Sequence, residues 1–308
     1  MPPAPMSAAQ RQAVAAVAAF LRCPVCASPV RLDDGQVRCD QGHAFNIARQ
    51  GYISLTSGRG GAGTGDSAAM VMARERFLGG GHYRPLADAI AGLAARLDRG
   101  GPGLVLDLAG GTGYYLARVL DELPERDGAC VDLSAPALRR AARAHPRAAA
   151  LGADAWQRLP FADDSAALVL SVFGPRNAAE IRRVLAPGGT VIVATPGQAH
   201  QQELREALGL IGIDERKPAR LADAFAGYAS AGLTAVRYQP RLSRADLIDL
   251  VAMGPSARHI AADALADRVA ALRAPVAVTV DVEVRSYRGL SRAARSRVVR
   301  CEITYIQT

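Results

Sequence analysis

The chain has 308 residues, enough for one large domain or for two unequal ones. Half of the residues are hydrophobic and 21% are charged, which is ordinary for a soluble globular protein. The formal net charge is +8 and is carried almost wholly by arginine, because Lys217 is the single lysine. This excess favours an acidic partner, with a solvated basic surface as the alternative.

The first 21 residues include a short apolar run, rich in alanine, from Ala13 to Leu21. The run is too short to span a bilayer and has no basic segment before it, so we expect a helical or disordered extension rather than a signal peptide. We expect no other segment to cross a membrane. The cysteines are too clustered for a disulfide framework, so a cytoplasmic protein with a metal site is expected, and Cys130 and Cys301 are interpreted as inert core residues.

The stretch RCPVCASPVRLDDGQVRCDQGHAF, residues 22–45, carries a metal-binding pattern. Cys23 and Cys26 form a C-x-x-C pair, and Cys39 and His43 follow as a C-x-x-x-H pair. Four such ligands in two close pairs match tetrahedral zinc, and with all four positions filled by protein the zinc is expected to be structural. The alternatives are a coincidental cluster and a redox C-x-x-C pair, although a redox pair does not require the second pair.

The middle of the chain alternates between strand and helix patterns. Glycine-rich residues 57–66 predict a loop, followed by helices over residues 67–78, with Asp66 or Ser67 as N-cap, and over residues 87–100. From residue 103 onward, short apolar runs alternate with helical segments, which predicts a doubly wound parallel sheet. The expected strands are residues 103–109, 128–134, 147–155, 166–174 and 189–196, with a helix over 177–189 that is closed by Pro187.

The last third of the chain has a weaker pattern. Residues 233–241 predict a strand, and residues 243–254 predict a helix with an N-terminal capping box. Residues 276–284 and 298–306 alternate between apolar and polar side chains, which favours antiparallel strands at the edge or end of the sheet.

The segment VLDLAGGTGYY, residues 105–115, joins an expected strand to an expected helix. Its glycines, Gly111 among them, let a ligand approach the backbone closely, and the start of the next helix favours polar or anionic groups. The loop does not match the dinucleotide pattern G-x-G-x-x-G, so on its own it is a weak indication of cofactor binding.

Three acidic residues, Asp107, Asp132 and Asp154, stand at the ends of successive expected strands. Asp132 is placed to hold ribose hydroxyls, and Asp154 to meet an adenine amino group. This ordered series is typical of class I S-adenosylmethionine-dependent methyltransferases, while capping of the following helices is the alternative interpretation.

These segments occur in one order with three others, GDSAAMVMARERFLGGGHYRPL, LPFADDS and LAPGGTVIVATPGQAHQQEL. In this arrangement the chain resembles the 23S ribosomal RNA (guanine-N1)-methyltransferases of the RlmA group over residues 22–210. The segment MGPSARH, residues 253–259, resembles the TlrB-like macrolide-resistance branch of that family more than the housekeeping branch.

The resemblance implies an α/β fold of the class I, Rossmann-like type, with a seven-stranded, mostly parallel sheet behind a small N-terminal zinc ribbon. It implies S-adenosyl-L-methionine and structural Zn2+ as cofactors, and 23S rRNA or the ribosomal particle as partner, with a homodimer left open. The expected division is an extension over residues 1–21, the ribbon over 22–56, a linker and cofactor-contacting helix over 57–85, and the methyltransferase domain over 86–308.

Several residues carry over from the family. Gly113 and Tyr114 match its cofactor loop, Tyr83 matches an aromatic cofactor contact, and His200 matches a residue beside the cofactor pocket. Ala109 departs from the broader fold, whose motif has a glycine there, and we expect binding to be retained with a slightly shifted loop. The residues that match the family's zinc ligands are Cys23, Cys26, Cys39 and His43.

The expected chemistry is methyl transfer to guanine N1. The sulfonium methyl is already activated, so the protein mainly has to align the nitrogen with it. N1 carries a proton near neutral pH, for which His200 and Asp107 are the candidate bases by position and solvent is the alternative. Because N1 lies on the Watson–Crick edge, the base must be unpaired or flipped, and one of four aromatic residues would stack on it: Tyr83, Tyr114, Trp156 or Phe173.

In the leading hypothesis the ribbon and the basic surface grip the RNA while the sheet domain binds the cofactor. Two other functions stay open: a methyltransferase for a small metabolite, with the ribbon as a structural lid, and a non-catalytic RNA-binding protein with a degenerate pocket. The sequence does not identify the guanine, the housekeeping or resistance role, or the oligomeric state.

Overall fold

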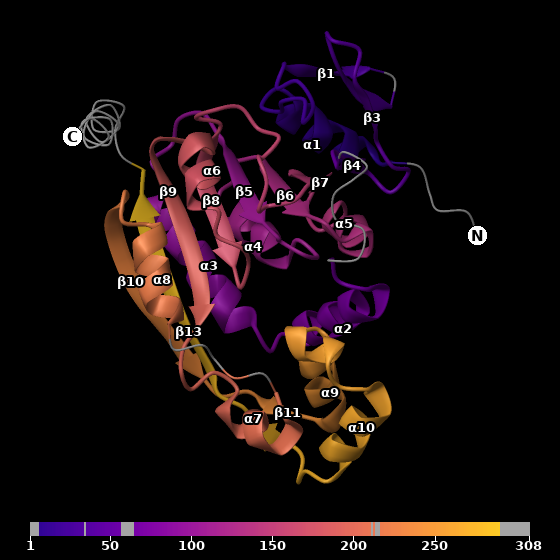
Figure 1. The fold of residues 1–308 in the computed structure, drawn as a ribbon, viewed down its shortest axis with the longest axis vertical. Helices are drawn as coiled ribbons and strands as arrows, with labels where there is room; N and C mark the ends of the chain where they lie inside the picture. The colour runs from indigo at the N-terminus through magenta and orange to yellow at the C-terminus, as the bar shows by residue number, and fades with distance from the viewer. Residues whose placement is uncertain (1–5, 34, 57–64, 211, 213–215, 290–308) are drawn as a thin grey trace, which may run out of the picture.

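The computed structural model describes residues 6–33, 35–56, 65–210, 212 and 216–289. Over these residues the chain forms one large sheet with helices on both faces, and a small three-stranded sheet close to the N-terminus (Figure 1). The strands of the large sheet follow the order β10-β13-β9-β8-β5-β6-β7-β4.

The parallel part of the large sheet confirms the five strands expected in the middle of the chain. Within this group of five, every pairing is parallel. The acidic residues and the loop after residue 172 lie at the carboxyl ends of the first four strands. The five strands are β5 (Leu104–Leu108), β6 (Gly128–Asp132), β7 (Ala148–Gly152), β8 (Ala166–Val172) and β9 (Leu185–Pro196).

Two antiparallel strands complete the expected seven. β13 (Val280–Arg288) pairs with β9, and β10 (Ala229–Tyr238) pairs with β13. The expected strand over residues 276–284 is therefore divided, because residues 276 and 277 form the short strand β12 (Val276–Ala277), which pairs with β11 (Arg241–Leu242). The strand expected over residues 298–306 and Cys301 lie outside the described residues.

An eighth strand, β4 (Tyr52–Ser54), joins the large sheet in parallel beside β7. The expectation of seven strands missed it because it comes from the zinc-binding segment. The rest of that segment forms a separate small sheet of β1 (Val30–Asp33), β2 (Gln36–Cys39) and β3 (Ala44–Asn46). Backbone pairing thus ties the end of the ribbon directly to the edge of the large sheet.

The expected N-terminal extension is helical over α1 (Ala8–Ala18). Its Ser7 cap accepts a hydrogen bond from the Gln10 backbone N–H, and the Gln10 side chain accepts one from the Ser7 N–H, which closes a capping box. Val14 and Val17 are buried in the same hydrophobic cluster as Leu106 and Leu151 of the large sheet. The helix therefore packs on the sheet together with the ribbon (Figure 1).

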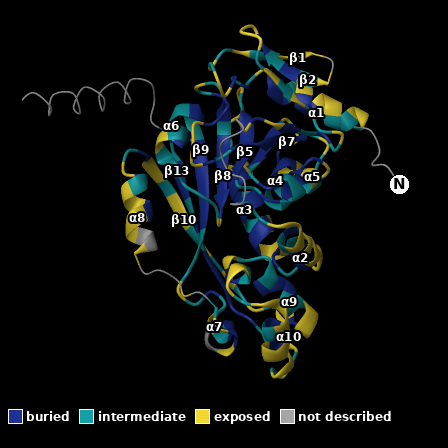
Figure 2. Ribbon diagram, turned by 45° about the vertical axis from the view of Figure 1, so that its right-hand side comes forward, coloured by how far each residue is buried: buried dark blue, intermediate teal, exposed yellow. Residues whose placement is uncertain are grey.

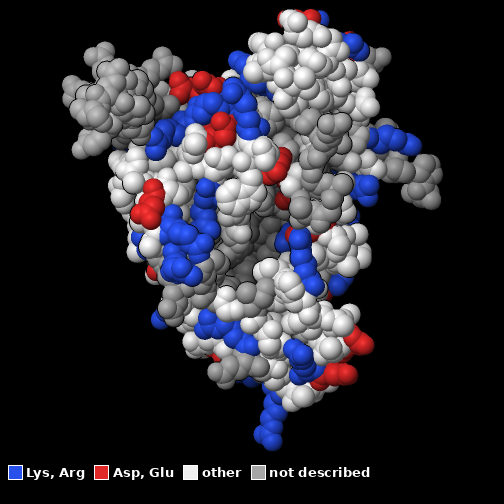
Figure 3. All heavy atoms as spheres, viewed as in Figure 1, with Lys and Arg blue, Asp and Glu red and all other residues white. Residues whose placement is uncertain are grey.

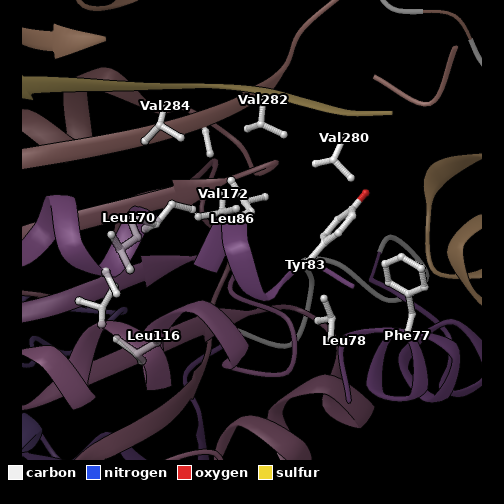
Figure 4. Close-up of a cluster of buried hydrophobic side chains, with 14 of the residues drawn as sticks. Phe77, Leu78, Tyr83, Leu86, Leu116, Leu170, Val172, Val280, Val282 and Val284 are labelled. Atoms are coloured by element: carbon white, nitrogen blue, oxygen red, sulfur yellow. The ribbon is translucent and has the colours of Figure 1, made fainter. Parts of the chain in front are cut away.

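Both faces of the large sheet are covered, as the continuous apolar strands require. In β5, Leu104, Leu106 and Leu108 belong to the cluster on one face, and Val105 belongs to the cluster on the other. Figure 2 shows the central strands almost entirely buried, and Figure 4 shows side chains of the second cluster, with Tyr83 among them.

The remaining helices largely match the expected segments. Ser67, rather than Asp66, caps the helix after the glycine-rich loop. The helix expected over residues 177–189 ends already at Val184, because Leu185 pairs with Ala166 and starts β9. These helices are α2 (Ala68–Gly79), α3 (Arg84–Leu97), α4 (Tyr114–Glu122), α5 (Ala135–Ala141), α6 (Ala178–Val184), α7 (Gln202–Leu208), α8 (Lys217–Ala224), α9 (Arg244–Ala252) and α10 (Ala262–Ala270).

Helix α9 brings the C-terminal part of the chain back to α2 (Figure 1). Arg76 of α2 donates to both oxygens of the Asp249 carboxylate of α9, from Nε at 2.9 Å and from Nη2 at 2.5 Å. A short 3-10 turn over Pro255–Arg258 follows α9. Among the described residues, no helix is long and apolar enough to cross a membrane.

Candidate functional site

The four predicted zinc ligands lie together in the ribbon. The ligand atoms of Cys23, Cys26, Cys39 and His43 are all within 4.8 Å of one another. The Cys26 and Cys39 sulfurs are 3.7 Å apart, and His43 Nδ1 lies 3.6 Å from the Cys23 sulfur and 3.4 Å from the Cys39 sulfur. No other group of three or more His, Cys, Asp and Glu ligands is found in the part of the chain that the structure describes.

These distances fit one tetrahedral zinc ion. With bonds of about 2.3 Å to sulfur and about 2.0 Å to nitrogen, tetrahedral ligands stand roughly 3.8 Å apart for two sulfurs and roughly 3.5 Å apart for sulfur and nitrogen. Hydrogen bonds from Ser28 lower the pKa of the Cys26 thiol to about 6, which favours the thiolate that zinc requires. The residues present therefore match a closed structural site with no position for a reacting group.

The arginines on the ribbon hairpin are paired with acids of the same hairpin. Arg31 forms an ion pair with Asp40, and Arg38 Nε lies 3.0 Å from Asp33 Oδ2. Such exposed pairs contribute little stability, but they neutralise much of the charge that the hairpin would offer to phosphates. The hairpin is consequently a weaker phosphate-binding surface than the sequence suggested.

A cavity of about 810 Å³ opens at the carboxyl ends of the parallel strands β5, β6, β7 and β8. Ligands of open α/β sheets bind at this edge. Figure 3 shows the hollow in the middle of this face, with arginine or lysine side chains on both sides of it. Seven of the eight proposed cofactor residues line it: Tyr83, Asp107, Gly111, Tyr114, Asp132, Asp154 and His200.

Gly113 is the exception, because it does not line the cavity. It has a left-handed backbone with φ of 78° and stands directly before α4. A Cβ at this position would lie 3.0 Å from the Ala144 Cβ and 3.2 Å from the Ala141 Cα. The glycine is thus required where the loop passes α5, and its contribution to the cavity is indirect.

The loop after β5 is bent by residues with positive φ. Ala109 has φ of 55° and Gly111 has φ of 58°, so alanine adopts the left-handed conformation at the position where the broader fold has glycine. A Cβ on Gly110 would lie 2.5 Å from Asp107 Oδ2 and 2.7 Å from Cys130 Sγ. The missing side chain at Gly110 keeps the loop close to the end of the strand.

Asp107 is a buried carboxylate without a counter-charge. Only 1% of the residue is exposed, and no hydrogen bond from the described residues satisfies either of its carboxylate oxygens. Burial, followed by the charge of Asp132, raises the pKa of Asp107 to about 7, and the nearby backbone N–H of Leu116, which does not reach hydrogen-bonding geometry, offsets this only in part. A buried acid in this state is well suited to a cationic ligand.

The other two acids of the series are held by backbone groups. Asp132 accepts the N–H of Gly111 at 2.9 Å and the N–H of Ser134 at 2.8 Å. Burial raises the pKa of Asp132, and these two hydrogen bonds oppose the shift. Asp154 accepts the N–H of Trp156 at 2.9 Å. Both side chains therefore have a fixed direction at the cavity wall.

Tyr83 and His200 lie side by side in the wall of the cavity. Tyr83 Oη is 3.4 Å from His200 Nε2 and accepts a hydrogen bond from Gln201 Nε2 at 3.2 Å. His200 Nδ1 accepts the backbone N–H of Asp281 at 3.3 Å. The neutral imidazole then carries its proton on Nε2.

The low pKa and the hydrogen bonds of His200 make it a poor candidate for a general base. Burial is the main cause that lowers the pKa of His200 to about 4, so the ring is neutral at physiological pH. Its one lone pair is occupied by the Asp281 N–H, and Nε2 faces the Tyr83 hydroxyl. The group is arranged as a hydrogen-bond donor rather than as a proton acceptor.

Sequence reasoning missed Gln201 and Asp281, which fix this pair. Gln201 is adjacent to His200, but nothing in its neighbourhood marks it as functional. Asp281 reaches His200 only because β13 lies next to β9 in the sheet. A contact over that distance in sequence leaves no local signal.

The four aromatic candidates for stacking on a base differ sharply in exposure. Tyr83 is 3% exposed and Tyr114 is only partly exposed, whereas Phe173 is 42% exposed and Trp156 is 63% exposed. Phe173 and Trp156 both line the cavity. The structure therefore favours these two over the tyrosines.

Comparisons with known proteins agree with both parts of the chain. Residues 21–56 match a family model described as RlmA, N-terminal, and residues 105–189 match one described as Methyltransferase domain. Fold, cavity and ribbon together define a class I S-adenosylmethionine-dependent methyltransferase with an N-terminal Cys3His zinc ribbon.

Three curated relatives specify the family. A 23S rRNA (guanine(748)-N(1))-methyltransferase of Streptomyces fradiae is 47% identical over 268 residues, covering 86% of this chain and 95% of that protein. A putative 23S rRNA (guanine-N(1)-)-methyltransferase of Micromonospora griseorubida is 46% identical over 286 residues, covering 87% and 97%. The putative 23S rRNA (guanine-N(1)-)-methyltransferase YxjB of Bacillus subtilis (strain 168) is 32% identical over 196 residues, covering 61% and 68%. The chain belongs to the 23S rRNA (guanine-N1)-methyltransferase family.

Proposed function

We propose that the protein transfers a methyl group from S-adenosylmethionine to N1 of one guanine in 23S rRNA. The observation that carries this function is the 47% identity to the Streptomyces fradiae guanine(748) enzyme over 95% of that protein. The match covers 95% of that protein, and residues 21–56 separately match the RlmA N-terminal model, so more than the cofactor fold alone supports an RNA substrate.

The cavity wall fits the cofactor. The unpartnered carboxylate of Asp107 would hold the cationic amino-acid end of S-adenosylmethionine. Asp132 keeps accepting capacity for ribose hydroxyls, and Asp154 lies on the next strand end, where an adenine edge would reach it. Gly111, Tyr83 and His200 would line the space between these groups, with Tyr114 at its border.

When bound, the cofactor supplies an activated methyl group on a sulfonium. The chain's own task is then to hold guanine N1 in line with that methyl and to exclude competing orientations. The N1 proton needs an acceptor, for which His200 is poorly arranged and Asp107 is committed to the cofactor cation. Water at the open mouth of the cavity is the acceptor that this geometry favours.

We further propose the resistance role and the assembly that the resemblance implied. The segment over residues 253–259 contributes Met253, Gly254, Pro255, Ser256, Arg258 and His259 to the cavity wall, so the part that resembles the macrolide-resistance branch lies at the site. Action in the cytoplasm, on ribosomal particles or naked rRNA, and a homodimer are consistent with this proposal.

We also propose that the chain divides into an extension over residues 1–21, a ribbon over 22–56, a linker with a cofactor-contacting helix over 57–85 and the methyltransferase domain over 86–308. Asp66 of the linker forms an ion pair with Arg74 of α2, and both line the cavity. The linker therefore contributes to the cofactor side of the site.

Methyl transfer from labelled cofactor distinguishes the proposed function from its competitors. We expect label in 23S rRNA and none in a pool of small metabolites. RNA binding should also weaken steeply with salt, because each released phosphate counterion contributes a slope of about −0.7 to −0.9 in log affinity against log salt. Label in the metabolite pool would favour the small-molecule enzyme, and failure to bind the cofactor would favour a non-catalytic RNA-binding protein.

A further inference from the structure

The loop after β8 carries two features outside the set of residues proposed to hold the cofactor. Residues 173–176 follow β8 directly and form one side of the cavity mouth. Phe173 has φ of 56°, a left-handed conformation that is uncommon and costly for a bulky residue. Strain of this kind persists only where the surroundings hold it, and it is frequent at ligand-binding positions.

The surrounding structure holds this loop at three points. The Phe173 N–H donates to the Ala194 carbonyl at 3.0 Å, and the Ser171 hydroxyl donates to the Pro175 carbonyl at 2.9 Å. A Cβ on Gly174 would lie 2.8 Å from the Leu108 carbonyl oxygen, so the loop rests directly on the end of β5. The Phe173 ring is thus fixed at the mouth while 42% of the residue stays exposed.

The exposed ring of Phe173 continues the aromatic wall of the cavity. Its centroid lies 6.4 Å from the Tyr83 ring and 6.0 Å from the His200 ring. Asn177, directly after the loop, donates from Nδ2 to the Trp156 carbonyl at 2.9 Å and so ties this loop to the one that carries Trp156. The partly exposed Phe173 ring is therefore accessible to a flat ligand in the cavity.

Arg176 lies on the same loop and has no counter-charge among the described residues. It lines the cavity and is partly buried, and within the described residues it forms no hydrogen bond or ion pair. Burial and the nearby charge of Arg220 lower the pKa of Arg176. Arg183 of α6, by contrast, is bound to Glu180 and to Asp163. A partly buried guanidinium with a like-charged neighbour is suited to an incoming anion, and its planar fork matches phosphate.

We propose that Phe173 and Arg176 hold the target nucleotide, with the Phe173 ring stacked on the unpaired guanine and the Arg176 guanidinium bound to a phosphate of the same RNA strand. This inference rests on the proposed function, since it names how that same cavity takes its RNA. Stacking orients the base, and the phosphate contact determines how deeply the base enters the cavity. Together they place N1 next to the cofactor methyl.

The test uses the full chain with bound S-adenosylhomocysteine and an RNA transcript of the 23S rRNA hairpin that contains guanine 748. A second hairpin has an abasic site at that position, so it keeps every phosphate and lacks only the base. The variants are Phe173→Leu, Phe173→Tyr, Arg176→Gln and Arg176→Lys. Arg96→Gln, which removes an exposed charge from α3 away from the cavity, is the matched control. Unchanged cofactor affinity and melting temperature show that each variant is folded.

The two residues should respond differently to the two hairpins. Phe173→Leu should weaken binding of the intact hairpin about tenfold, leave the abasic hairpin unaffected and keep the salt slope, while Phe173→Tyr restores binding. Arg176→Gln should weaken both hairpins and lower the salt slope by about 0.7 to 0.9, while Arg176→Lys keeps that slope. Arg96→Gln should change neither the affinity for the hairpins nor the salt slope beyond a small general charge effect.

The outcomes separate this inference from the function on which it rests. If the unmodified protein methylates the hairpin but Phe173→Leu and Arg176→Gln bind like Arg96→Gln, the assignment of these two residues is wrong and the function stands. Equal losses by Phe173→Leu on intact and abasic RNA would also overturn the stacking role. If the unmodified protein transfers no methyl to 23S rRNA, the proposed function itself fails.

Discussion

At the scale of single residues, the site is built from groups whose environment is unfavourable until a ligand arrives. Among the described residues, neither the buried acid Asp107 nor the cation Arg176 has a partner. Ala109 and Phe173 both have left-handed backbones that glycine would adopt more easily. Such groups lower the stability of the free protein and are expected where binding supplies the missing partner.

Replacing Asp107 by asparagine should stabilise the free protein while weakening cofactor binding. The folded-state pKa of about 7 lies above the unfolded value of 3.8, so this group's contribution to stability is lost as the pH rises through 7. At pH 8 the variant should melt a few degrees higher than the unmodified protein, and at pH 5 the difference should shrink because the acid is then neutral. Calorimetry on the free and cofactor-bound protein checks both effects, and a lower melting temperature of the free variant at pH 8 would contradict them.

Two substitutions in the loop after β5 should have opposite effects. Ala109→Gly removes the left-handed strain and should raise stability by up to about 1 kcal/mol with cofactor binding retained. Gly110→Ala places a methyl group 2.5 Å from Asp107 Oδ2 and should abolish cofactor binding. Denaturant unfolding measures the stability of Ala109→Gly, and isothermal titration measures cofactor binding by both variants. Retained binding in Gly110→Ala would show that the loop is free to move.

His200→Gln tests whether the imidazole is a base. Since its Nδ1 accepts the Asp281 N–H and burial keeps its pKa near 4, we expect the rate constant for methyl transfer to fall by less than about tenfold, with an unchanged pH profile. Loss of a true general base would cost about 10²- to 10⁴-fold and would remove a pKa from the profile. Single-turnover rates between pH 6 and 9 show whether His200 is a hydrogen-bond donor or a general base.

At the scale of elements, the strands of the large sheet and the helices that cover it could be predicted from the sequence, because the residues of each element carry its hydrophobic pattern. β5 to β9 are short apolar runs buried on both faces, and their acids and glycines fall at strand ends where the pattern changes. β4 was missed because only three residues form it and its partner β7 comes almost a hundred residues later. The Asp281–His200 contact escaped for the same reason, and the ion pairs of Arg31 and Arg38 depend on side-chain geometry that no spacing encodes.

The ribbon is expected to unfold when zinc is removed or Cys39 is replaced by serine. A segment of this size buries too little apolar surface to fold without its metal, so loss of one ligand should abolish most of the zinc affinity. From the sequence we predict lower RNA affinity with cofactor binding retained. Zinc content, RNA binding and cofactor titration of the Cys39→Ser protein measure the three effects.

Because β4 belongs to the large sheet, the same experiment also tests whether the ribbon supports the cofactor site. β4 lies beside β7, at whose end Asp154 faces the cavity. Equal loss of RNA and cofactor affinity in Cys39→Ser would show that the ribbon acts as a scaffold for the sheet edge rather than as an RNA-gripping module. Loss of RNA binding alone would support the gripping role in spite of the paired arginines.

At the scale of the whole molecule, three regions distant in sequence close around one cavity. The sheet supplies the acids, α2 and the linker supply one wall, and the segment after α9 supplies another, held to α2 through Asp249 and Arg76. The net charge of +8 matches a polyanionic substrate, and Figure 3 shows basic side chains on both sides of the hollow. This arrangement suits one unpaired nucleotide of a larger RNA.

Primer extension on 23S rRNA tests the central claim most directly. A methyl group on guanine N1 blocks Watson–Crick pairing and therefore stops reverse transcriptase at that base. After incubation of ribosomal RNA with the protein and S-adenosylmethionine, we expect one new stop at a single guanine, guanine 748 if the specificity is that of the Streptomyces fradiae relative. The stop should be absent when the cofactor is omitted. No new stop on naked rRNA or on ribosomal particles would contradict the account.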